Sequence, residues 1–293
     1  IDSSEIPLII TEGAKKAAAN IRELKANLPI PFAFETGVNY LQPLSGELSD
    51  GQFFAAVAEE ADCGIVLDLH NLWCNEQNGR QPLQEVLAEL PLERVWEVHL
   101  AGGQDYKGYW LDAHSDLVPA PLMELAKDII PTLPNLKALI FEILEDFVRI
   151  NNIQPEALLE QVQQLRSLWD SRGSRFRTAT VSSSKSLNRQ SVETTDQLPS
   201  AAEWETTLGE LITLRQITQS VGKDLNHDPG TQVFQHLVAS QRGGMVVTSL
   251  HLSTRLLRLS LGEPQFQTLL ETFWRTTPPE LFASDEAFNW ATY

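Results

Sequence analysis

The sequence predicts an α/β fold in its first part and an all-helical fold in its last part. Helical and strand-like segments alternate as far as residue 169, and the strand-like segments are short, continuously apolar runs. Such runs are typical of parallel strands that are covered on both faces. Because four of them end in or near an acidic or histidine residue, we predict an incomplete TIM-type (β/α) barrel followed by a small all-α domain. The predicted boundaries are 1–169 for the barrel portion, 170–199 for a flexible linker and 200–293 for the helical domain.

Composition narrows the class of protein. The chain has 293 residues, of which 42% are hydrophobic, so it has enough apolar material for a packed core and enough length for two domains. The formal net charge of −17 disfavours a nucleic-acid partner, because phosphates are neutralised by Lys and Arg. No apolar run approaches the roughly 20 residues that span a bilayer, so we expect no membrane partner. Two cysteines, Cys63 and Cys74, do not make a disulfide framework and favour a cytoplasmic location.

Capping residues and prolines divide the first part into its elements. Thr11 is a candidate N-cap for a helix over 12–26, and a strand after Pro31 closes at Glu35. The segment from Ser49 to Gln52 has the form of a capping box before a helix over 53–61. Further strands are predicted over 65–68, 95–99 and 136–142, and further helices over 82–90, 121–130 and 155–169.

The last part is predicted to be helical. From 171 to 197 the residues are mainly Ser, Thr, Arg and Gln with few large apolar side chains, which is typical of a linker. Gly262 and the pair Pro278 and Pro279 fit helix ends. His227, His236 and His251 are interpreted as surface or packing residues, because they lie far apart in the sequence. The apolar spacing predicts helices over 201–221, 231–239, 246–261 and 264–274.

The side chains at the strand ends indicate one polynuclear metal site. Carboxylate and imidazole ligands suit iron, manganese or zinc, whereas the scarcity of thiolates argues against a structural zinc site or an iron–sulfur cluster. The candidates are acidic, histidine and amide residues at strand ends or in the loops that follow them. They are Glu35, Asp68, Asn71, His99, Asp112, His114 and Glu142.

Each candidate also has an ordinary structural interpretation. A lone acidic residue at a strand end more often caps a helix or faces solvent, and a lone histidine such as His99 is more often a hydrogen-bonded core residue. Repetition in four successive units weakens that interpretation, since a barrel makes strand ends converge. His70 fits a supporting position as well as direct ligation, and it is our candidate catalytic residue. Cys74 is interpreted as a small buried residue.

These motifs resemble the later motifs of the multinuclear non-haem iron-dependent oxidases, the family of the methanobactin-biosynthesis oxidase. The resemblance spans roughly residues 5–168. It implies a TIM barrel that holds two or three iron ions, uses dioxygen as co-substrate and modifies cysteines of a ribosomally made precursor peptide, for example to oxazolone and thioamide groups. It also implies that the seven candidate ligands bind iron. The residues that carry it are Glu35 after its strand, Gly64–Asn71, Pro91–Gly102, Leu111–His114 and Leu139–Glu142.

The chain departs from that family in three ways. The resemblance implies that the family's barrel begins with strands that supply further histidine ligands, and we expect this chain to begin after them. Its four clear strands are too few to close a barrel of eight. His70 stands where many relatives have Asn. Thr36 follows Glu35 where Asn is common.

The helical part is similar to a second protein of the same system. Leu256–Phe266 and Phe273–Pro279 resemble the helical part of partner proteins that accompany these oxidases and help recruit the leader of the precursor peptide. The resemblance implies a fusion of oxidase and partner-like domain, with room for a separate partner protein as well. An unrelated helical bundle is the alternative.

Three functions therefore stay open at this point. The leading hypothesis is an iron oxidase that modifies a precursor peptide. The second is a metal-dependent hydrolase or isomerase of the TIM-barrel class, which zinc or magnesium and oxygen-independent turnover would favour. The third is a non-catalytic peptide-binding scaffold, which peptide binding insensitive to chelators would favour.

Overall fold

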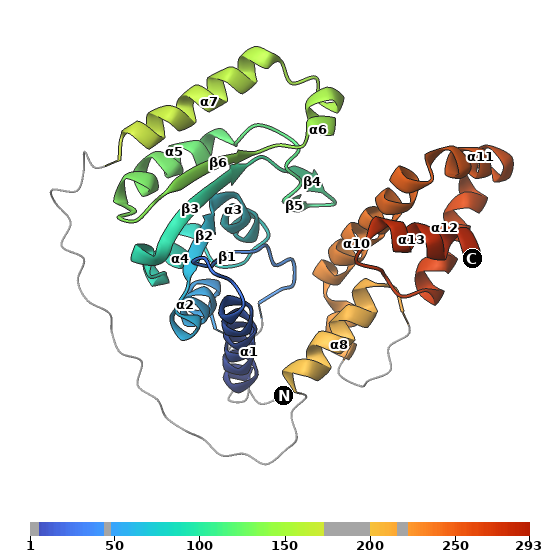
Figure 1. The fold of residues 1–293 in the computed structure, drawn as a ribbon, viewed down its shortest axis with the longest axis horizontal. Helices are drawn as coiled ribbons and strands as arrows, with labels where there is room; N and C mark the ends of the chain where they lie inside the picture. Colours follow the sequence, from blue (N-terminus) through green and yellow to red (C-terminus); the bar gives the residue numbers. More distant parts are fainter. Residues whose placement is uncertain (1–5, 44–47, 173–199, 216–221) are drawn as a thin grey trace. The chain divides into compact units, whose positions relative to one another are not determined.

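The computed structural model describes residues 6–43, 48–172, 200–215 and 222–293, which fall into two compact units (Figure 1). The first unit comprises residues 1–39 and 43–196, and the second comprises residues 40–42 and 197–293. The predicted fold class, an incomplete TIM-type barrel followed by a helical region, is confirmed. From residue 173 onward the predicted linker lies outside the described residues, so the predicted domain boundaries stay a prediction.

The first unit is built on a parallel sheet. Its strands are β1 (Ala33–Glu35), β2 (Gly64–Asp68), β3 (Val95–Ala101), β4 (Gln104–Tyr106), β5 (Tyr109–Leu111) and β6 (Ala138–Glu142). The order in the sheet is β1-β2-β3-β6 with every pair parallel, and β4 and β5 form a separate antiparallel hairpin. The helices are α1 (Ile6–Ala26), α2 (Asp50–Ala61), α3 (Leu69–Gln77), α4 (Leu83–Glu89), α5 (Ala120–Ile129), α6 (Glu145–Ile150) and α7 (Pro155–Asp170). Two 3-10 turns, η1 (Leu92–Arg94) and η2 (Ile130–Thr132), complete the unit.

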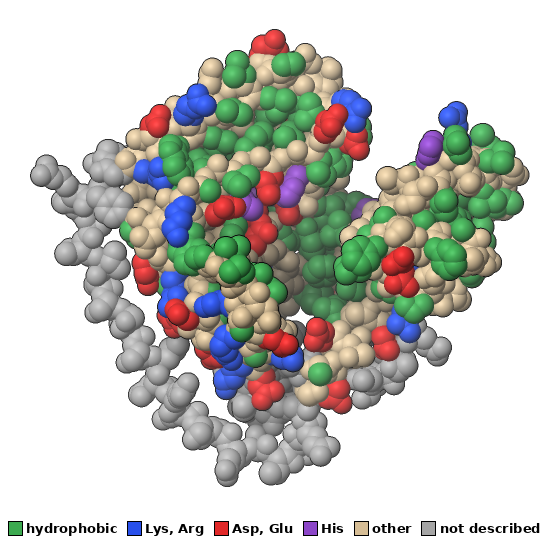
Figure 2. Space-filling model, viewed as in Figure 1, with side chains coloured by type: hydrophobic (Ala, Val, Ile, Leu, Met, Phe, Trp, Pro, Cys, Tyr) green, Lys and Arg blue, Asp and Glu red, His purple; other side chains and the backbone are tan. Residues whose placement is uncertain are grey.

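The two faces of the sheet differ in polarity. Ile65 and Leu67 of β2 and Leu100 of β3 are fully buried in the core formed with the helices. Alternate residues point to the opposite face, where acidic and histidine side chains gather over the strands (Figure 2). The expectation of two covered apolar faces is therefore wrong for this inner face, on which Ile140 of β6 is 38% exposed.

Two local predictions for the first unit can be compared with the structure. The capping box is confirmed, because Ser49 Oγ accepts a hydrogen bond from the backbone N of Gln52 at 3.2 Å. Thr11 does not cap a helix, because α1 begins at Ile6 and passes through it. Helix α3 was not predicted. The carboxylate of Asp68 accepts the backbone N–H of Asn71 at 2.8 Å, so β2 ends there and a helix begins at Leu69.

The described part of the second unit consists of helices α8 (Ala201–Ile212), α9 (Gly222–His227), α10 (Pro229–Ser249), α11 (His251–Leu261), α12 (Glu263–Thr276) and α13 (Ala283–Thr292). The prediction of separate helices over 231–239 and 246–261 is wrong, because α10 continues through Gly243 and the break falls at Leu250. A Cβ at Gly243 would lie 3.5 Å from the Trp274 ring, so this glycine packs at an interhelical contact. That packing outweighs the low helix propensity of glycine. No described helix of either unit is both long and apolar enough to cross a membrane.

A buried ion pair connects three helices of the second unit. Arg242 of α10 is 3% exposed and Glu286 of α13 is fully buried, and Arg242 Nε donates to Glu286 Oε1 at 2.6 Å. The guanidinium also donates to the carbonyl oxygens of Trp274 and Thr277, at 3.3 and 3.0 Å. The second oxygen of Glu286 accepts the backbone N–H of Glu280 at 3.0 Å. Because both charges have partners, the pair is compatible with burial.

We expect Glu286→Gln to destabilise the helical unit by about 3–5 kcal/mol, because it leaves the charge of Arg242 buried without a counter-charge. Replacing both partners with apolar residues, Arg242→Met with Glu286→Leu, is expected to cost less than the single change. Urea unfolding followed by tryptophan fluorescence measures both. Glu205→Gln, at an exposed position of α8, is the matched control. Equal unfolding midpoints for Glu286→Gln and this control would contradict the assignment.

Candidate metal centre

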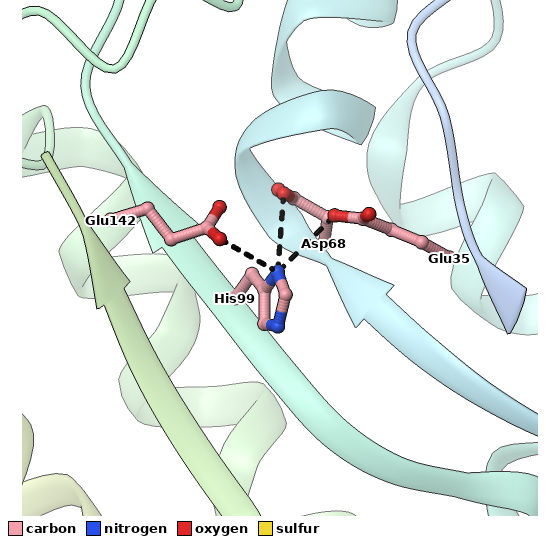
Figure 3. Close-up of side chains that lie close together, drawn as sticks. All are labelled: Glu35, Asp68, His99 and Glu142. Atoms are coloured by element: carbon pink, nitrogen blue, oxygen red, sulfur yellow. Dashed lines mark hydrogen bonds and ion pairs between the residues drawn. The ribbon is translucent and has the colours of Figure 1, made fainter. Parts of the chain in front are cut away.

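Four metal-capable side chains meet at the carboxyl ends of the four parallel strands (Figure 3). Glu35, Asp68 and Glu142 are the last residues of β1, β2 and β6. His99 lies two residues before the end of β3 and is the register partner of Asp68. One ligand atom from each of the four lies within 4.8 Å of the others. The parallel register produces this convergence, because alternate side chains of neighbouring strands share one face.

The imidazole of His99 stands at the centre of the cluster. Its Nδ1 is 3.2 Å from Glu35 Oε1, 3.4 Å from Glu142 Oε1 and 3.9 Å from Asp68 Oδ2. Its Nε2 is 2.7 Å from Glu97 Oε1. Burial opposes the charged ring, but the hydrogen bond with Glu97 and the three carboxylates outweigh it and raise the pKa of His99. Nδ1 is therefore the ring atom that is directed toward the other ligands.

Glu97 was missed by the sequence analysis. It lies two residues before His99 on β3, so both side chains point to the inner face of the sheet. The spacing of two residues from His99 could have identified Glu97. It was overlooked because Glu97 lies in the middle of an apolar run, whereas the other candidates lie at the ends of such runs. A carboxylate on the outer nitrogen of a ligating histidine fixes the tautomer and the orientation of the ring.

One buried side-chain oxygen of Asp68 and one of Asn71 have no hydrogen-bond donor. Asp68 Oδ1 accepts from Asn71 N, but Asp68 Oδ2 has no hydrogen-bond partner, and neither has Asn71 Oδ1. The amide nitrogen of Asn71 donates to the carbonyl oxygen of Thr36 at 3.1 Å, which fixes the orientation of the amide. Burial, with the charges of Asp112 and Glu35, raises the pKa of Asp68 to about 7. Buried acceptors without donors cost free energy unless a cation binds them.

Asp112 and His114 follow the hairpin and lie beside Glu142. His114 Nε2 is 3.1 Å from Asp112 Oδ1 and 3.4 Å from Glu142 Oε2. The carboxylate of Asp112, helped by Glu142 and Asp68, raises the pKa of His114 to about 9. Burial opposes ionisation of Asp112, but its contacts with His114 and His70 outweigh burial and lower its pKa.

The structure thus brings most of the predicted ligands together. Glu142 connects the two groups, because one of its oxygens faces His99 and the other faces His114. His70 is fully buried, with Nδ1 2.9 Å from Asp112 Oδ1. Cys74 is also buried, and burial raises the pKa of its thiol.

A carboxylate and histidine cluster at the carboxyl ends of parallel strands is typical of metal-dependent enzymes built on β/α barrels. Residues 5–167 match the family described as "RiPP precursor modification enzyme MbnB/TglH/ChrH", in which RiPP denotes a ribosomally synthesised and post-translationally modified peptide. The chain belongs to this family.

Curated relatives match part of the chain. A UPF0276 protein of Streptomyces avermitilis is 33% identical over 110 residues, which are 38% of this chain and 23% of the relative. One from Anaeromyxobacter is 33% identical over 135 residues, 46% of this chain and 48% of the relative. One from Neisseria meningitidis serogroup B is 35% identical over 135 residues, 44% of this chain and 48% of the relative. The chain spans half or less of the length of these three relatives.

We expect Glu97→Leu to weaken Mn²⁺ or Fe²⁺ binding by about 10- to 100-fold, because the outer nitrogen of His99 loses its carboxylate partner. Glu97→Gln keeps an acceptor oxygen and is expected to lose less. Competition with a chromogenic chelator measures the affinity. Glu93→Leu changes an exposed glutamate near the other end of β3 and serves as control. Unchanged affinity in Glu97→Leu would show that Glu97 does not support the site.

We expect chelator-treated protein to lose stability as the pH rises from about 6.5 to about 9. The pKa of His114 is raised from 6.5 to about 9 in the folded chain, so its charged form stabilises the fold fully below pH 6.5, and this contribution disappears as the pH passes 9. The loss is on the order of 3 kcal/mol. Thermal unfolding across this range measures it. His114→Gln is expected to flatten the profile, whereas His251→Gln, on the exposed side of α11, is expected to leave it unchanged.

Proposed function

We propose that this chain contributes the metal centre of an iron- and dioxygen-dependent oxidase that modifies cysteine residues of a ribosomally made precursor peptide. The observation that carries the proposal is the meeting of Glu35, Asp68, His99 and Glu142 at one edge of the sheet. Membership in a family of precursor modification enzymes supports the class of substrate. Iron and dioxygen are proposed from the donor set and from the resemblance of the motifs.

The donor set fits iron. Carboxylate oxygens and an imidazole nitrogen suit Fe²⁺ and Mn²⁺, and the buried, donor-free oxygens of Asp68 and Asn71 suit a hard cation. Glu142 faces both histidines, which supports a role for it between two ions. We propose that two or three ions are held by Glu35, Asp68, Asn71, His99, Asp112, His114 and Glu142.

The residues of the chain would prepare this centre in three ways. Glu97 keeps Nδ1 of His99 directed at the cluster. The side chain of Asp68 is 0% exposed and lies on the buried side of the site, whereas that of Glu35 is 46% exposed and lies on the side open to solvent. A peptide cysteine would approach from the side of Glu35. When bound, iron would supply a coordination position for the substrate thiolate and the electrons that reduce dioxygen.

We propose that the helical unit helps recruit the precursor peptide, with domain limits at 1–169, 170–199 and 200–293. This rests on the resemblance of its last helices to the partner proteins of such oxidases. A tethered recruiting domain raises the local concentration of peptide at the site without any tighter contact. A separate partner protein and a cytoplasmic location belong to the same proposal.

The test is co-expression of the protein from its natural gene with a cysteine-containing precursor peptide. We expect two or three irons per chain, a mass change on the peptide in air, and no mass change under nitrogen. Substituting each peptide cysteine with serine is expected to abolish the product. His99→Ala and Asp68→Ala are expected to lose both iron and product.

Two outcomes would favour the other functions. Zinc or magnesium content with oxygen-independent turnover would indicate a hydrolase or an isomerase. Peptide binding that chelators leave unchanged, with no product formed, would indicate a scaffold.

A further inference from the structure

A chain of hydrogen bonds, which we call the relay, runs from the half-buried Trp110 through the fully buried His70 to the half-buried Asp112. Trp110 Nε1 is 3.2 Å from His70 Nε2, and His70 Nδ1 is 2.9 Å from Asp112 Oδ1. The side chain of His70 is 0% exposed. Both ring nitrogens are therefore engaged inside the protein, and the ring is out of reach of a substrate.

The chemistry of the first partner fixes the tautomer of His70. An indole N–H is a donor only, so His70 Nε2 must accept from Trp110. The ring proton then lies on Nδ1, which donates to Asp112 Oδ1. Trp110 thus determines that the face of His70 toward Asp112 is a hydrogen-bond donor.

Trp110 is held in place through its own backbone, by the side chain of Asn78. The side-chain amide of Asn78, at the end of α3, accepts from Trp110 N at 2.8 Å and donates to Trp110 O at 2.9 Å. A Cβ at Gly103 would lie 2.8 Å from Trp110 Nε1 and 3.0 Å from His70 Cε1. The hairpin and α3 therefore leave the two rings little room for another arrangement.

We propose that His70 is a positioning residue that orients the carboxylate of Asp112 for metal binding, in place of the catalytic role expected from the sequence. The inference rests on the proposed metal centre, because Asp112 matters there as a ligand. Asp112 Oδ1 receives His70 from the interior and lies 3.1 Å from His114 Nε2. A carboxylate fixed in this way needs little reorganisation when an ion binds.

Substitutions at His70 separate positioning from packing. His70→Asn places an amide nitrogen near the position of Nδ1 and keeps a donor for Asp112, whereas His70→Leu removes it. With Mn²⁺ as probe and a competing chelator, we expect His70→Leu to bind about 10- to 100-fold more weakly and His70→Asn to stay within about threefold of the wild type. Trp110→Phe is expected to lie between them, since the ring is then free to adopt either tautomer.

Thermal midpoints of the chelator-treated variants provide the readout for packing. A purely structural role would lower the midpoints of both His70 variants and leave their Mn²⁺ affinities equal. His251→Asn, an exposed histidine of the helical unit, is the control and is expected to change neither quantity. Wild-type affinity in His70→Leu, or equal losses in His70→Leu and His70→Asn, would overturn the proposal.

A second measurement needs no metal. Nitrogen-15 shifts of the His70 ring, assigned with His70→Asn, are expected to show a protonated Nδ1 and an unprotonated Nε2 in wild type, and a mixture of tautomers in Trp110→Phe. A protonated Nε2 in the wild type would overturn the relay even if the chain binds Mn²⁺. The opposite result, the expected tautomer in a chain that binds no Mn²⁺, would instead refute the proposed metal centre.

Discussion

The register of four parallel strands is the constraint on which the candidate site depends. Asp68 pairs with His99, and Glu142 pairs with Ala101, so these side chains reach one edge of the sheet from the same face. A slip of one residue would turn a ligand toward the helices and a core residue toward the inner face. The burial of Ile65 and Leu67 against the helices opposes such a slip. The apolar core and the metal-capable cluster are thus opposite faces of one packing arrangement.

The carboxylates at this edge of the sheet destabilise the fold when no cation is bound. Three carboxylates surround His99, and burial raises the pKa of Asp68 to about 7, so this carboxyl group is only partly ionised near neutral pH. The raised pKa values of His99 and His114 show that a positive charge is favoured there. Functional centres commonly lower the stability of the fold in this way.

The sequence predicted which strand-end side chains meet better than it predicted the residues that contact them. Glu35, Asp68 and Glu142 could be found because each ends an apolar run, and the parallel strands could be inferred from the same runs. Glu97 could not be found in this way, because it lies inside the strand. It is informative only when one notes that its spacing of two from His99 puts both side chains on the same face. The relay depends on two elements that went unpredicted, α3 and the β4–β5 hairpin. Helix α10 was divided wrongly because the packing of Gly243 on Trp274 is a tertiary contact that helix propensity does not contain.

The two glycines that connect β3 to the hairpin decide where this protein tolerates variation. A methyl group at Gly102 would lie 2.3 Å from the carbonyl oxygens of Asp116 and Leu117, and one at Gly103 would lie 2.1 Å from that of Leu111. A Cβ at Gly108, in the turn of the hairpin, meets nothing within 4 Å. The base of this loop therefore has no room for a larger residue, whereas Gly108 at its tip is favoured by its φ of +85° and not by close neighbours. The backbone between β3 and Asp112 is thus constrained by close contacts at one end of the hairpin and by its own conformation at the other.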